Sequence, residues 1–328
     1  MVMLAMAVGM PDTLAFYKEN AADMMFAKYQ YVLKSYEDEE GEVIRTENKD
    51  AEKFSIYALQ KRSEALDEEV SVYGIADESK YVKIADLASL QENEVYISES
   101  FRDKYGLEVG DIISLEEKYE NKQYRFTISG IYDKCQSIAV FMPMQNYNNI
   151  FDLEEKEFSG YLSDSEITDI AEENIATVIT ERDITKMCDQ LDHSMGAYMQ
   201  YFQILCVLLS AVLIYLLTKI IIEKNENAIS MTKILGYENR EIASLYLLST
   251  TIVLIFVNAV SVFLGALVMA RAWEAIMSTY SGWFTFVIEP VGYVKMFAFV
   301  LIGYLVVTVF DFNRIKRISM EEALKNVE

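Results

Sequence analysis

The sequence predicts an α+β extracytoplasmic domain followed by an α-helical transmembrane bundle, with three complete spans and a stub of a further N-terminal span. Two observations lead to this prediction. Residues 1–197 hold 19 Lys and Arg against 41 Asp and Glu, whereas residues 198–328 hold 10 of each. The second part also contains almost uncharged runs that reach the roughly 20 residues needed to cross about 30 Å of hydrocarbon. We therefore expect an acidic part in water and a second part in lipid.

The three predicted membrane spans are residues 198–222, 245–270 and 291–310. Their sidedness follows from Lys and Arg in the short connections, which stay on the cytoplasmic side. Residues 219–244 hold four basic side chains and the tail 311–328 holds four more, whereas residues 271–290 hold only Arg271. This asymmetry predicts that 223–244 and 311–328 are cytoplasmic, that 271–290 is a short external loop and that 11–197 is extracytoplasmic.

The N-terminal ten residues form a short apolar run that ends at Pro11. Ten residues cannot cross a bilayer, and no basic residue precedes the run as in a signal peptide. We expect residues 1–10 to be the truncated end of a first transmembrane helix and Pro11 to break it.

The predicted outer domain mixes helices and short strands. Residues 12–35 have apolar positions at helical spacing, and the acidic run at 37–42 indicates a solvated loop. Ser98 can cap a short helix that runs through Tyr105 and ends at Gly106. Runs rich in Val, Ile, Tyr and Phe predict strands at 54–59, 70–75, 95–98, 112–115, 124–131 and 138–141.

A long stalk helix is predicted to begin at about residue 180. Thr180 and Asp183 have the spacing of a helix start, and apolar residues then recur every three or four positions up to the first span. A single helix of about forty residues would leave the outer domain and cross the membrane. Such a helix could transmit movement or could serve as a plain anchor, and the sequence favours neither.

The composition excludes several classes of function. The net charge of −22 argues against a nucleic-acid partner, since tracking phosphates requires a basic surface. The single His193 has no nucleophile motif beside it, and Cys135, Cys188 and Cys206 lie far apart without metal-ligand spacing. We therefore predict no catalytic, cofactor or metal residues. Asn258, the strongly polar residue in mid-span, could bond a neighbouring helix or contact a substrate.

The connection 223–244 is the most informative stretch of the sequence. Ile229, Met231, Ile234 and Leu235 lie at helical spacing among polar residues, and Gly236 ends the pattern. A helix outside the membrane with an apolar face must bury that face, and its two candidate partners are the lipid interface and another protein.

This connection resembles the cytoplasmic loop of the FtsX/MacB-like permease family, the membrane subunits of ATP-binding cassette (ABC) transporters. The resemblance is carried by Ile229-Ser-Met-Thr-Lys233-Ile-Leu-Gly236-Tyr with the following Arg240-Glu-Ile, and by the tail from Arg314 to Lys325. The segment from Tyr105 to Leu115 and Phe126-Thr-Ile-Ser-Gly-Ile-Tyr are similar to the family's outer domain. The resemblance implies the C-terminal module of a longer permease, used as a single-module dimer or as half of a two-repeat chain.

The resemblance implies that the chain is not an enzyme, because ATP hydrolysis in this family belongs to a separate cytoplasmic ABC ATPase. Its other implied partners are a second permease copy or repeat and membrane lipid. The implied contact with the ATPase falls on Ile229, Met231, Lys233, Leu235, Gly236, Tyr237 and Arg240. ATP-driven movement would then pass outward for export, extraction or mechanotransmission. The alternative is a signalling or scaffold protein whose outer domain senses a peptide or activates an extracellular enzyme without transport.

Overall fold

A computed structural model describes residues 1–63, 66–120 and 122–318. The chain divides into two compact units. The first, called here the helical unit, comprises residues 1–14 and 191–272 and the C-terminal part from residue 286. The second, called the sheet unit, comprises residues 15–190 together with residues 273–285. The predicted α+β domain and transmembrane bundle correspond to these two parts.

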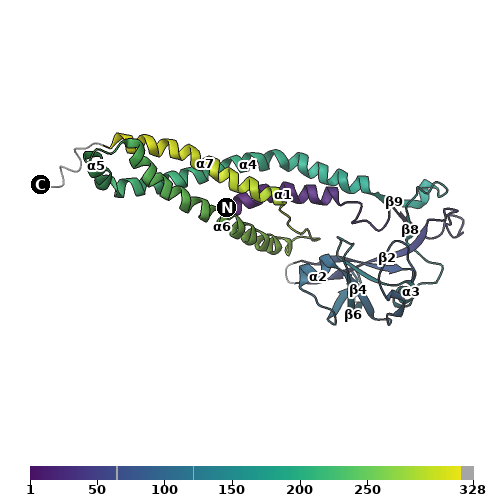
Figure 1. The fold of residues 1–328 in the computed structure, drawn as a ribbon. Helices are drawn as coiled ribbons and strands as arrows, with labels where there is room; N and C mark the ends of the chain where they lie inside the picture. The colour runs from purple at the N-terminus through teal and green to yellow at the C-terminus, as the bar shows by residue number, and fades with distance from the viewer. Residues whose placement is uncertain (64–65, 121, 319–328) are drawn as a thin grey trace. The chain divides into compact units, whose positions relative to one another are not determined.

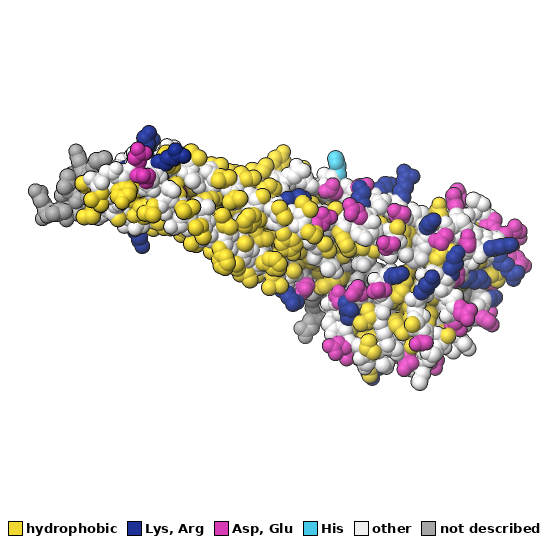
Figure 2. Space-filling view, viewed as in Figure 1, with side chains coloured by type: hydrophobic (Ala, Val, Ile, Leu, Met, Phe, Trp, Pro, Cys, Tyr) yellow, Lys and Arg dark blue, Asp and Glu magenta, His cyan; other side chains and the backbone are white. Residues whose placement is uncertain are grey.

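In the part of the helical unit that the structure describes, the chain forms four long helices and a short fifth one (Figure 1). They are α1 (Val2–Glu19), α4 (Glu181–Lys224), α5 (Glu226–Ile234), α6 (Asn239–Met277) and α7 (Pro290–Arg317). Helices α4, α6 and α7 are long and apolar enough to cross a membrane, and they contain the three predicted spans. On the face drawn in Figure 2, hydrophobic side chains cover these helices. The chain is a multi-pass membrane protein.

Helix α1 continues through Pro11, so the predicted break at this residue is wrong. Proline removes the N–H that would have bonded the carbonyl four residues earlier, which is that of Ala7. The structure supplies a substitute, because Gln203 Nε2 of α4 donates to Ala7 O at 2.8 Å. An amide side chain on a neighbouring helix thus lets α1 tolerate a proline among apolar surroundings.

Among its described residues, the sheet unit has nine strands in the order β3-β7-β4-β6-β5-β2-β8-β1-β9. An additional pairing between β3 and β2 closes the first six strands into a ring, and β8, β1 and β9 extend from β2. The pairs β3–β7 and β4–β6 are parallel, and the other pairs are antiparallel. The strands are β1 (Tyr29–Leu33), β2 (Glu52–Lys61), β3 (Glu68–Ile75), β4 (Glu94–Ser98), β5 (Ile112–Glu116), β6 (Gln123–Tyr132), β7 (Ala139–Pro143), β8 (Gly160–Ser163) and β9 (Ile175–Thr180).

Alternate residues of the ring strands form one buried core, as the period of two in a strand requires. This core contains Leu59, Val70, Val72, Val95, Ile97, Ile113, Leu115, Phe126, Ile128, Val140 and Met142. Helices α2 (Glu99–Tyr105) and α3 (Met144–Phe151) add Phe101 and Tyr147 to it. As predicted, Ser98 Oγ accepts from Phe101 N and Gly106 ends α2 in a left-handed conformation.

The helical spacing of residues 12–35 predicts the structure correctly only as far as Glu19. Helix α1 ends at Glu19, and residues Tyr29–Leu33 form strand β1 between β8 and β9. In this strand Tyr31 and Leu33 are buried, and the exposed fraction of each side chain is below a tenth. Apolar residues two apart fit a strand as well as spacings of three and four fit a helix, and long-range pairing decides between them.

Helix α4 is a single helix of 44 residues, in agreement with the predicted stalk. Asp183 Oδ2 accepts hydrogen bonds from Thr180 N at 3.0 Å and from Thr180 Oγ1 at 2.7 Å, which fixes the first turn. Gly196 lies inside the helix without interrupting it. The chain therefore passes from the sheet unit into the helical unit without leaving the helical conformation.

The bond from Gln203 to Ala7 yields a first prediction. In a Gln203→Leu variant the Ala7 carbonyl loses its partner in a place that water does not reach, which should lower the free energy of unfolding by about 1–3 kcal/mol. In a Pro11→Ala background residue 11 regains an N–H for this carbonyl, and the same change at 203 should cost much less. Thermal unfolding of the four variants in lipid nanodiscs measures this difference, and equal costs in both backgrounds would contradict the assignment.

Candidate functional site

Helix α5 forms a short, sharply ended element between α4 and α6. Its end is a Schellman motif, in which Gly236 N donates to Lys233 O at 3.1 Å and Tyr237 N donates to Thr232 O at 3.4 Å. Gly236 has a φ of +91°, which a residue with a side chain rarely adopts. The next helix starts with a capping contact, because Glu241 Oε2 accepts from Glu238 N at 3.0 Å. The loop around α5 therefore has a defined backbone.

One face of α5 is buried against the ends of the three long helices. Ile229, Ser230 and Lys233 are the buried residues of this face. Ile229 packs in an apolar cluster that draws one or two residues from each neighbour, namely Ile222 of α4, Ile242 and Ala243 of α6, and Ile315 and Ile318 at the end of α7. This cluster fixes the position of α5 relative to the helices that continue into the membrane.

Lys233 fastens α5 to the C-terminus of α7. Its Nζ donates to the carbonyls of Ile315 at 2.7 Å, Lys316 at 3.3 Å and Ile318 at 2.7 Å. The last carbonyls of a helix have no partner within the helix, and the negative end of its dipole favours a cation. The ammonium thus supplies hydrogen bonds to carbonyls that the end of α7 itself satisfies poorly. Burial lowers the pKa of the Lys233 ammonium from its ordinary value.

Ion pairs between side chains also join α4 to α7 at the same end. Arg314 Nη2 of α7 bonds Glu223 Oε1 of α4, and Lys219 Nζ lies 3.9 Å from the same carboxylate oxygen. These groups are partly exposed, so the pairs contribute less to stability than the buried contacts of Lys233. The structure therefore locks α5, α4 and α7 together on one side of the bundle.

Outside this buried face, α5 and the turn that follows it expose an apolar patch, called here the coupling surface. Met231, Ile234, Leu235 and Tyr237 are 60%, 50%, 76% and 58% exposed. Arg240, at the start of α6, is exposed next to them in the sequence. Four exposed large apolar side chains within seven residues, outside the predicted membrane spans, indicate a surface that another molecule covers.

The structure separates the seven predicted contact residues into two groups. Ile229 and Lys233 are turned inward, whereas Met231, Leu235, Gly236, Tyr237 and Arg240 are exposed. Ile234 was not among the seven, although its apolar side chain belongs to the exposed patch. Of the predicted tail, Arg314 to Ile318 are described, and residues 319–328 with Lys325 lie outside the described residues.

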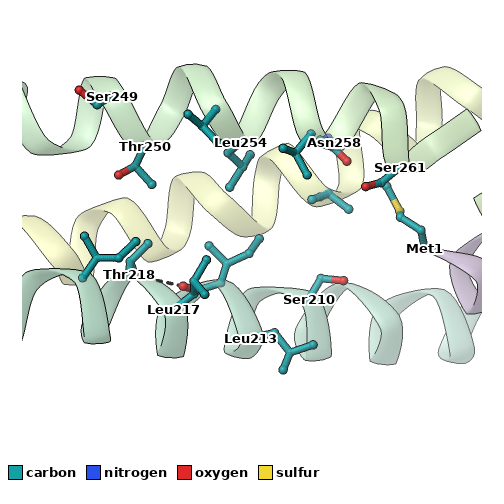
Figure 3. Close-up of a pocket in the computed structure, with 15 residues that line it drawn as sticks. Met1, Ser210, Leu213, Leu217, Thr218, Ser249, Thr250, Leu254, Asn258 and Ser261 are labelled. Carbon is teal, nitrogen blue, oxygen red and sulfur yellow. Dashed lines mark hydrogen bonds between the residues drawn. The ribbon is translucent and has the colours of Figure 1, made fainter. Parts of the chain in front are cut away.

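A cleft of about 550 Å³ lies between α4 and α6 in the helical unit (Figure 3). Its lining is mostly apolar, with Leu213, Leu217 and Leu254 among the lining residues. Asn258 lines the cleft, donates from Nδ2 to Phe297 O of α7 at 3.1 Å, and leaves its buried Oδ1 without a partner. The predicted bond to a neighbouring helix is present, and the second polar atom of the same side chain remains available.

The side chains that could act as nucleophiles or metal ligands are scattered over the described part of the chain. Cys135, Cys188 and Cys206 are free and buried. Within the described residues no group of three or more His, Cys, Asp and Glu side chains could hold a metal ion. The coupling surface is therefore the candidate functional site.

The part of the chain that includes the coupling surface matches a known protein family. Residues 201–320 match the family described as FtsX-like permease C-terminal, which confirms the resemblance inferred from the loop. The match begins within α4 and includes α5, α6 and α7. Among solved structures the chain is similar to the extracellular domain of the noncanonic ABC-type transporter YknZ from Gram-positive bacteria, with 12% identity and a TM-score of 0.27, over 52% of this chain and 94% of that chain. No curated protein sequence matches the chain.

The contacts of Lys233 yield a second prediction. Lys233→Met keeps the apolar stem but removes the ammonium from the carbonyls at the end of α7, and Ile315 O then keeps only the 3.4 Å bond from Ile318 N. The loss should cost about 1–3 kcal/mol for each buried carbonyl that the ammonium bonds. Hydrogen exchange of the α5 amides should become at least about tenfold faster. Lys224→Met, at an exposed position in the last turn of α4, is the control. Unchanged exchange in Lys233→Met would show that this ammonium does not hold α5.

Proposed function

We propose that the chain is a permease subunit of an ABC transporter and couples ATP hydrolysis by a separate cytoplasmic ATPase to movement of its sheet unit. The match of residues 201–320 to the FtsX-like permease C-terminal family supports this proposal. In this proposal the coupling surface binds the ATPase. The chain itself carries out no ATP chemistry. The movement serves export, extraction or mechanotransmission.

The observation that carries the proposal is the division of α5 into a fastened face and an exposed apolar face. An apolar patch of Met231, Ile234, Leu235 and Tyr237 in water is unfavourable until it is covered. Ile229 and Lys233 meanwhile tie the helix to the ends of α4, α6 and α7. A partner that moves the exposed face of α5 therefore also moves the ends of the membrane helices, because α5 is packed against them and is not a flexible loop.

The route outward in the proposal is helix α4. It runs without a break from Lys224, beside α5, to Glu181, where it adjoins strand β9 in the sequence. A continuous helix has no flexible joint at which a displacement of its cytoplasmic end would be lost. This property favours transmission over simple anchoring.

A third prediction concerns the binding of the ATPase. Leu235→Asp and Met231→Asp place charge on the exposed apolar face without touching the buried one, and each should abolish co-purification with the cognate ATPase. The expected loss is on the order of 2 kcal/mol or more, since a charged group would be buried without a partner. Ile112→Asp, which charges an equally exposed apolar residue of the sheet unit, is the matched control.

The outcomes of this pull-down discriminate between the functions. Loss in both α5 variants with binding retained in Ile112→Asp supports the coupling surface. Binding that survives both changes moves the contact elsewhere and leaves lipid as the partner of this face. The absence of any ATPase partner favours the signalling or scaffold function instead.

A fourth prediction concerns transmission through α4. Gly196→Pro removes a helical N–H and adds a steric clash, which costs about 3 kcal/mol in a helix interior, whereas Gly196→Ala favours the helix. With the ATPase bound, nucleotide-dependent changes in hydrogen exchange of the sheet unit should be lost in the proline variant and kept in the alanine variant. An unaltered response in Gly196→Pro would exclude α4 as the route.

A further inference from the structure

The connection between α6 and α7 is structurally part of the sheet unit. Residues 273–285 group with residues 15–190, although the chain on either side belongs to the helical unit. Trp283 is a member of the core of the strand ring, with 7% of its side chain exposed, and Met277 packs against that core. The connection that joins α6 to α7 thus contributes a large aromatic side chain to the interior of the sheet unit, of which it is itself a part.

A buried ion pair of the sheet unit is directed at this connection. Glu68 stands at the start of β3 and Lys104 in α2, they form a salt bridge, and each side chain is only 1% exposed. Lys104 Nζ also donates to Tyr280 O at 2.7 Å and to Gly282 O at 3.1 Å. Glu68 Oε1 accepts from Gly282 N at 2.7 Å and from Ser281 Oγ at 3.2 Å.

The pair depends on the connection for its hydrogen bonding. An ammonium has three donors, and Lys104 directs one to Glu68 and two to the connection. Both contacts of Glu68 Oε1 likewise come from residues 281 and 282. Buried charges are tolerated only when their remaining hydrogen bonds are satisfied, so removal of the connection would leave both groups undersatisfied.

Further contacts hold the two ends of the connection. Thr285 N donates to Tyr17 Oη at 2.8 Å, and Trp273 Nε1 donates to Phe284 O at 2.7 Å. Gly282 has a φ of +82°, which aims its N–H and its carbonyl at the pair and which a residue with a side chain rarely adopts. The backbone conformation of Gly282 and the side chains of the ion pair therefore favour the same position of the α6–α7 connection.

We propose that Glu68 and Lys104 form a clamp that fastens the α6–α7 connection into the sheet unit, so that this unit is attached to membrane helices at the connection as well as through α1 and α4. The clamp is an inference about the chain alone. Its use in passing movement from α6 and α7 to the sheet unit rests on the function proposed above.

The test compares hydrogen exchange of the full chain in lipid nanodiscs, without any ATPase. In Lys104→Met and in Glu68→Gln the amides of residues 278–285 should exchange at least about tenfold faster, because one buried charge loses its partner and the connection loses its ligands. Amides of strand β6 should keep their protection. Lys156→Met is the matched control, since its pair with Glu37 is 3.0 Å long but exposed, and it should change neither segment.

The outcomes separate a clamp from a general contribution to folding. Faster exchange confined to residues 278–285 supports the clamp. Unchanged exchange there in both variants overturns it. If Lys104→Met also speeds exchange in β6, the milder Glu68→Gln decides. An equal loss of amide protection in β6 and in the connection in that variant overturns the clamp and shows that the pair only stabilises the core.

A second arm tests the use of the clamp once the ATPase is bound. Nucleotide-dependent exchange changes in the sheet unit should be present in Lys156→Met and reduced at least twofold in Glu68→Gln. An equal response in the two variants overturns transmission through the connection. Failure to bind an ATPase overturns the proposed function, and the first arm still decides on the clamp.

Discussion

The constraint on which the structure depends is that lipid offers no hydrogen-bond partners. Every backbone N–H and carbonyl inside the bilayer must be satisfied by the protein, which is why the spans are continuous helices. The constraint also explains the exceptions. Pro11 leaves the Ala7 carbonyl without an N–H, and Gln203 reaches across from α4 to supply one. Asn258 similarly directs its Nδ2 to the carbonyl of Phe297.

The need of backbone carbonyls for hydrogen-bond donors also shapes the candidate site, at the C-terminal end of α7. The last carbonyls of α7 need donors, and Lys233 of α5 supplies three hydrogen bonds to them. A residue that the sequence places among basic loop residues thereby becomes part of the interior. Its burial fixes which face of α5 points inward, and this leaves Met231, Leu235 and Tyr237 outward. The exposure of these apolar side chains therefore follows from the way in which Lys233 satisfies the hydrogen bonding of the carbonyls at the end of α7.

The sequence predicted those features that local patterns determine. Uninterrupted apolar runs indicated the spans, short runs rich in Val, Ile, Tyr and Phe indicated the ring strands, and Ser98 with Gly106 marked both ends of α2. Features that depend on distant partners were missed. Strand β1 exists because β8 and β9 flank it, and Gln203 is 196 residues from the carbonyl that it bonds. The inward position of Lys233 was missed for the same reason, since its acceptors lie 82 to 85 residues further along the chain.

The two units are joined at four places along the chain, and these places differ in stiffness. The boundaries after residues 14, 190 and 272 fall inside α1, α4 and α6, whereas the boundary after residue 285 falls in a segment without regular structure before α7. A helix passes a displacement along its axis, but an extended segment bends. The irregular crossing therefore needs fixing by side chains close to it. Trp283 and Thr285 lie within a few residues of that crossing, and the Glu68–Lys104 pair bonds to residues 280–282 just before it. This buried ion pair therefore acts where the backbone is least able to hold its position unaided.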